Sequence, residues 1–143
     1  MKQRVPKSQQ KRQILIAVAV LAAAVVAGVL MLLFTGDITV TLGESSLQVQ
    51  AAYYGGVEVP YEEFDSVQLR QDFDFGTRVE GFGSPRLSLG VYKNGEYEYY
   101  NLYAYTGAKS AVILTSGQKT LVLACRTEAE TQALYESLLQ RIG

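Results

Sequence analysis

The stretch that decides the fold lies near the C-terminus and reads AVILTSGQKTLVLA, residues 111–124. Residues 111–114 and 120–124 are almost continuously apolar, and Ser116-Gly117-Gln118 between them is typical of a turn. Short apolar runs bounded by turn signals predict strands that are covered on both faces. These residues therefore predict two buried strands joined by a turn.

The period changes directly after these strands, and residues 127–142 have helical spacing. Thr127 and Glu130 form a capping box, in which side chains satisfy the free backbone donors at a helix start. The apolar positions that recur every fourth residue are Leu134, Leu138 and Ile142. This pattern predicts one amphipathic C-terminal helix, which must cover an opening of a curved sheet.

Upstream, apolar and polar side chains alternate, which is the period of a half-buried strand. The segments with strand signals are 38–42, 47–51, 57–59, 67–69, 77–81, 86–93 and 96–105. Asn94-Gly95 predicts a type I′ hairpin turn, and residues 60–64 predict a turn or a single helical turn. Together these signals predict a mainly β domain of about seven antiparallel strands, closed by the C-terminal helix.

The N-terminus has a different composition. Residues 1–13 contain five basic and no acidic side chains, and residues 14–34 contain no charged, Asn or Gln side chain. A helix over 14–34 would be about 31 Å long at ~1.5 Å per residue, close to the ~30 Å hydrocarbon thickness of a bilayer. The alternative is a cleaved signal peptide, but its apolar region is usually shorter. The pattern favours an uncleaved transmembrane helix over 14–34.

The charges on either side of this span predict its orientation. Basic residues are retained in the cytoplasm, so a basic arm at 1–13 would lie inside and the domain at 35–143 outside the cytoplasmic membrane. Eight of the 13 basic residues and all 14 acidic residues follow the span, which gives the exported part a net charge of −6. Such an acidic domain is a poor candidate for binding nucleic acid.

The composition also limits the chemistry. The chain has no His and one Cys, which excludes Ser-His-Asp triads, Cys-His dyads, internal disulfides and His-containing zinc sites. We expect no catalytic residues, no metal and no cofactor.

The order of strands and helix over residues 47–142 resembles the bacterial pleckstrin-homology-like domain family. The local features that carry the resemblance are VPYEEF (59–64), GTRVEGFG (76–83), GVY (90–92), YAY (103–105) and VLAC (122–125) followed by TEAE (127–130). The resemblance implies a bacterial protein with a two-sheet roll or split barrel capped by the helix, and a recognition module rather than an enzyme. Residues 43–46 lack the basic side chains of lipid-phosphate-binding relatives, so phosphoinositide binding is not implied.

A tyrosine-rich segment is the candidate binding face. Tyr97, Tyr99, Tyr103 and Tyr105 would share one face of a regular strand over 96–105. Tyrosine rings can bind peptides, sugars or headgroups, but they also stabilise sheets through cross-strand pairs. Both interpretations remain open on the sequence.

Carboxylates supply an alternative. Glu62, Glu63 and Asp65 lie together, and Asp72-Phe73-Asp74-Phe75-Gly76 resembles the start of a calcium loop, although a strand with both Phe side chains in the core fits better. We therefore predict a non-enzymatic, membrane-anchored domain that recognises a protein, peptide or envelope component. The alternatives are a tethered hydrolase that uses these carboxylates, and a structural protein that forms homo-oligomers through a strand edge.

Overall fold

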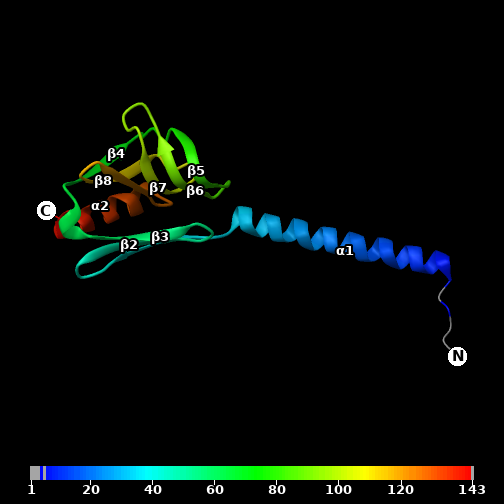
Figure 1. Ribbon diagram of the computed structural model, residues 1–143. Helices are drawn as coiled ribbons and strands as arrows, with labels where there is room; N and C mark the ends of the chain where they lie inside the picture. The colour runs from blue at the N-terminus through cyan, green and yellow to red at the C-terminus, as the bar shows by residue number, and fades with distance from the viewer. Residues whose placement is uncertain (1–3, 5, 143) are drawn as a thin grey trace. The chain divides into compact units, whose positions relative to one another are not determined.

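The computed structural model describes Arg4 and residues 6–142, and it divides into two compact units between Thr35 and Gly36. The first unit contains the helix α1 (Lys7–Phe34), and the second is a β-rich domain (Figure 1). By length and composition α1 can cross a membrane, and a signal sequence would meet the same criteria. The predicted span over 14–34 lies within α1, which begins seven residues earlier.

The second unit contains nine strands, a single 3₁₀ turn and one α-helix among the described residues. In chain order they are β1 (Ile38–Leu42), β2 (Ser46–Ala51), β3 (Gly55–Pro60), η1 (Tyr61–Glu63), β4 (Ser66–Gln71), β5 (Thr77–Gly83), β6 (Leu87–Lys93), β7 (Tyr100–Tyr105), β8 (Ser110–Ser116), β9 (Lys119–Ala124) and α2 (Glu128–Ile142). The prediction of a mainly β domain with a C-terminal helix is confirmed.

The strands form two sheets. The smaller sheet has the order β1-β2-β3, and the larger has the order β4-β8-β9-β7-β6-β5. All paired strands are antiparallel except β7 and β9, which are parallel. The parallel pair arises because β9 enters between β7 and its own hairpin partner β8. The fold therefore has nine strands rather than about seven, and one pair departs from the predicted antiparallel order.

Two hydrophobic cores lie on opposite faces of the larger sheet. Val112 and Leu114 of β8 belong to the core that also contains β2 and α2 residues, whereas Ala111 and Ile113 belong to the other core. The strand β9 alternates in the same way. Both strands are therefore covered on two faces, as their continuous apolar sequence predicts.

Residues 72–76 cover the second core as a loop, not as the polar strand that their alternation indicates. Phe73 is buried and its ring packs edge-on against Phe75 and Tyr100. The Tyr100 hydroxyl donates to the Phe75 carbonyl, and Asp74 Oδ1 accepts from the Gly76 N–H at 2.9 Å. Both Phe side chains pack as expected, while the backbone follows the aromatic contacts instead of a strand ladder.

The segment between β6 and β7 also differs from the predicted type I′ hairpin. It is a loop over 94–99, and Gly95 does not have a positive φ. Instead, Asn94 Oδ1 accepts from the N–H groups of Glu96 and Tyr97 at 2.9 and 2.6 Å. These side-chain hydrogen bonds compete with a tight backbone turn, which is the usual behaviour of asparagine in loops.

The helix α2 packs against β4 and β8 (Figure 1). Its start is capped as predicted, because Thr127 Oγ1 accepts from the Glu130 N–H at 3.1 Å. Leu138 is fully buried in the core, and Leu134 and Ile142 pack at its edge. The helix therefore closes one side of the domain with the face that the sequence indicates.

Candidate functional site

A groove of about 370 Å³ lies between β3 and the hairpin of β8 and β9. Its apolar lining consists of Val57, Val59, Phe64, Leu114 and Leu121. Charged residues at its rim are Glu58, Glu63 and Lys119. Binding sites commonly combine such an apolar floor with a few polar groups that fix the orientation of the ligand.

The strand β3 forms an open edge beside this groove. It lies at the end of its sheet and pairs only with β2. Within the described residues, no other element forms a hydrogen bond with the outer side of its backbone. Unpaired backbone groups of an edge strand can accept a further strand. The opposite edge is closed at its first residue, because the Ile38 N–H donates to Tyr105 Oη at 3.0 Å.

Two side-chain hydrogen bonds hold the wall of the groove that follows β3. Tyr61 Oη donates to the Gly43 carbonyl at 2.8 Å and fixes η1 against the β1–β2 turn. Asp65 Oδ2 accepts from the Gly117 N–H at 2.6 Å, which ties this segment to the β8–β9 turn. Phe64 lies between these two anchors and is buried in the core. The groove is therefore preformed by the fold.

The rim of the groove carries more negative than positive charge. Glu58 Oε1 accepts from Ser46 Oγ at 2.9 Å and from Gln48 Nε2 at 3.2 Å, so the carboxylate is held by the neighbouring strand. Glu63 is exposed at the end of η1, and Lys119 is exposed at the start of β9. Two carboxylates against one ammonium favour a ligand that carries a basic group.

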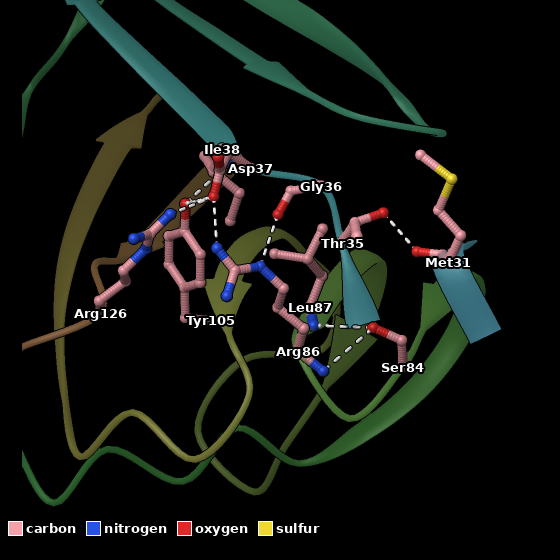
Figure 2. Close-up of polar contacts among 10 residues, drawn as sticks. All are labelled: Met31, Thr35, Gly36, Asp37, Ile38, Ser84, Arg86, Leu87, Tyr105 and Arg126. Atoms are coloured by element: carbon pink, nitrogen blue, oxygen red, sulfur yellow. Dashed lines mark hydrogen bonds and ion pairs between the residues drawn. The ribbon is translucent and has the colours of Figure 1, made fainter. Parts of the chain in front are cut away.

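A second cluster gathers around Asp37 at the start of the β domain (Figure 2). Arg86 Nε donates to the Gly36 carbonyl at 2.7 Å, and its Nη2 donates to Asp37 Oδ1 at 2.6 Å. Arg126 forms an ion pair with the same carboxylate. Both guanidinium groups lie over the Tyr105 ring, at 5.6 and 5.1 Å from its centroid. These contacts fix the chain where it enters the domain.

Replacing Asp37 should weaken this cluster. Hydrogen bonds from Arg86, then Arg126, lower the pKa of Asp37, so the folded state favours the carboxylate. The stabilisation is present above the ordinary aspartate pKa and is lost as the pH falls through the lowered value. Because the carboxylate is partly exposed, we expect Asp37→Asn to cost about 1 kcal/mol at neutral pH. Urea unfolding of the full chain at neutral and acidic pH measures this difference.

The matched control is Glu62→Gln on the exposed 3₁₀ turn, which should leave the free energy of unfolding nearly unchanged. The difference between wild type and Asp37→Asn should shrink below about pH 4. A difference that is constant across this range would contradict the role of the carboxylate charge.

The structure does not bring the four predicted tyrosines onto one face. The strand starts at Tyr100, so the alternation expected from 96 onward begins only there. Tyr103 is buried in the first core with Tyr105 packed at its edge, whereas Tyr97 packs with Phe73 in the second core. Tyr99 is exposed. Most of these rings are thus committed to packing, and a four-ring binding face does not form.

The predicted carboxylates are exposed and have separate contacts. Glu62 and Glu63 lie on η1, Asp65 hydrogen-bonds to Gly117, and Asp74 hydrogen-bonds to the N–H of Gly76 in its own loop. Among the described residues, no three acidic or cysteine side chains form a group that could hold a metal ion. The convergence that the hydrolase alternative requires is not seen in these contacts.

The groove and the Asp37 cluster both join residues that are distant in sequence, and neither was predicted. Asp37 drew notice only as the first charge after the apolar span. An edge position for β3 could not be inferred from its sequence, although the Gly55-Gly56 pair and Pro60 at its ends are typical of edge strands.

No family model, curated protein or solved structure matches the chain.

Proposed function

We propose that this protein is a membrane-anchored, non-enzymatic binding module that takes up an extended peptide segment of a partner protein along β3. The observation that carries the proposal is the open edge of β3 beside a preformed apolar groove. An added strand would satisfy the backbone groups of β3 and place every second side chain over the groove.

The helix α1 supplies the anchor in this proposal. Its apolar residues 14–34 match the thickness of a bilayer, and the basic arm before them supports an N-terminus in the bacterial cytoplasm. The β domain then lies on the outer side of the cytoplasmic membrane, where the groove meets envelope or secreted proteins.

The architecture is compatible with a pleckstrin-homology-like domain. Two sheets enclose a core, and a C-terminal helix closes one side, as in the family that the sequence resembles. The nine strands and the parallel β7–β9 pair are departures from the expected pattern. We assign the domain to this fold type as part of the proposal, and its recognition role follows from that assignment by analogy.

The lining of the groove defines the ligand. Val57 and Val59 are two residues apart on β3, so an added strand would present apolar side chains at alternate positions. Glu58 and Glu63 at the rim favour a Lys or Arg in the same segment. We therefore expect an extended, apolar and basic peptide.

Selection from a displayed library of short random peptides on the full chain in lipid nanodiscs tests this function. We expect enriched peptides that alternate apolar residues and include Lys or Arg. Val57→Thr keeps the shape of the side chain but adds a hydroxyl, and it should weaken their binding about tenfold. Glu63→Lys should weaken the basic peptides by a similar factor.

Thr41→Asp on β1 is the control, because it changes an exposed side chain on the opposite edge of the same sheet. It should bind the selected peptides as well as wild type does. The proposal fails if no peptide is enriched, or if Val57→Thr and Glu63→Lys bind the enriched peptides normally. Concentration-dependent sedimentation that Val57→Thr abolishes would instead show that β3 pairs with a second copy.

A further inference from the structure

We infer that the end of the β domain around Gly36 rests on the phospholipid headgroup layer, through Tyr53, Tyr54 and three arginines. The inference rests on the membrane anchoring proposed above, but it does not depend on the peptide groove. It assigns a second surface and a lipid partner to the domain.

Chain connectivity keeps this end close to the membrane at any angle between α1 and the domain. Gly36 follows Phe34, the last residue of α1, by two positions. Two residues span at most about 7 Å, and the headgroup layer on one side of a bilayer is roughly 5–7 Å thick. Gly36 therefore stays at the level of the headgroups, together with the side chains that surround it.

The strand register places two tyrosines at this end. Ile38 pairs with Ala51, and the next residue, Ala52, donates its N–H to the Asp37 carbonyl at 3.1 Å. The turn that follows contains Tyr53 and Tyr54, which are 50% and 37% exposed. A Cβ atom on Gly36 would meet the Tyr53 ring at 3.0 Å. Tyrosine is enriched at membrane–water interfaces because its ring is apolar and its hydroxyl is polar.

Three arginines lie around the same end. Arg86 and Arg126 surround Asp37, and the guanidinium of Arg78 lies over Gly83, where the chain leaves β5 to turn toward Arg86. These three positive charges and one carboxylate contrast with the net charge of −6 for residues 35–143. Guanidinium groups bind phosphate through paired N–H donors, so this end suits phospholipid headgroups.

The opposite end of the smaller sheet is acidic. Glu44 lies in the β1–β2 turn, and Glu62 and Glu63 follow β3. The five residues of β1 separate the two ends by about 15 Å. With the arginine end on the membrane, these carboxylates point away from the lipid phosphates, which lowers their repulsion.

Tryptophan fluorescence can test this contact because the chain contains no Trp. The full chain with Tyr53→Trp would be reconstituted in phosphatidylcholine–phosphatidylglycerol vesicles whose acyl chains are brominated near the headgroup. The control is Tyr99→Trp, which is 57% exposed and precedes Tyr100 at the end of β7 farthest from Asp37. We expect bromine to quench the Tyr53→Trp emission about twofold or more and to leave the Tyr99→Trp emission unchanged.

The outcomes separate this inference from the anchor itself. A chain that alkaline carbonate extracts from the vesicles would overturn the anchoring and this inference with it. An inserted chain whose Tyr53→Trp emission is unquenched, or quenched no more than that of Tyr99→Trp, would overturn the headgroup contact alone. Adding Arg78→Gln to the Tyr53→Trp chain should reduce the quenching in anionic vesicles, and an unchanged signal would contradict the role of the arginines.

Discussion

Gly90→Ala should destabilise the β domain by about 3 kcal/mol or more, which is a large part of the stability of a small domain. Gly90 of β6 faces Gly81 of β5, and both residues have φ near +130°. A Cβ atom on Gly90 would lie 2.0 Å from the Glu80 carbonyl oxygen. The contact is with backbone, so no side-chain rotation can relieve it, and the positive φ adds strain for any residue other than glycine.

The measurement is thermal unfolding of the full chain in detergent, followed by near-ultraviolet circular dichroism of its ten tyrosines. A loss of 3 kcal/mol corresponds to a decrease of roughly 10–20 °C in Tm for a domain of this size. The variant should melt at a lower temperature or fail to show a cooperative transition.

Two control variants separate the causes. Gly55→Ala keeps the cost of a positive φ, at +108°, without a neighbour within 4 Å, and it should lose about 1–2 kcal/mol. Gly95→Ala has neither a positive φ nor a close neighbour, and it should stay within about 0.5 kcal/mol of wild type. Equal Tm values for Gly90→Ala and Gly95→Ala would contradict the close approach of β5 and β6.

Leu138→Ala should lose about 2–5 kcal/mol, because it leaves a cavity where α2 packs on β4 and β8. The Leu138 side chain is 0% exposed, whereas Leu139 beside it is 39% exposed. Leu139→Ala changes the same residue type in the same helix and should lose less than about 1 kcal/mol. The pair therefore isolates burial from helix propensity, which is identical for the two substitutions.

Urea unfolding of both variants in detergent gives the comparison. An isolated helix of this length is marginally stable in water, so α2 depends on its contacts with the sheet. Similar losses for Leu138→Ala and Leu139→Ala would show that α2 does not pack through the face that contains Leu138.

Local patterns were enough to predict most elements and much of the core. The apolar runs at 111–114 and 120–124 are strands covered on both faces, and the capping box at Thr127 begins the C-terminal helix. These predictions succeed because periodicity and capping depend on residues that are close in sequence.

The sites could not be predicted in the same way. The expected tyrosine face assumes a strand from 96 to 105, but Asn94 binds two backbone N–H groups and the loop carries Tyr97 into the second core. The Asp37 cluster joins residues from three separate parts of the chain. No local signal specifies such meetings, because they depend on how the sheets assemble.

The sequence by itself determined an apolar helix at the N-terminus, a mainly β domain after it, and an amphipathic helix at the end, since each depends on short-range spacing. The tertiary structure decided that β9 lies between β7 and β8, that β3 is left as an edge beside a groove, and that Arg86 and Arg126 meet at Asp37. These features arise from strand pairing between distant segments, where many registers satisfy the local pattern and only the packing of both cores selects one.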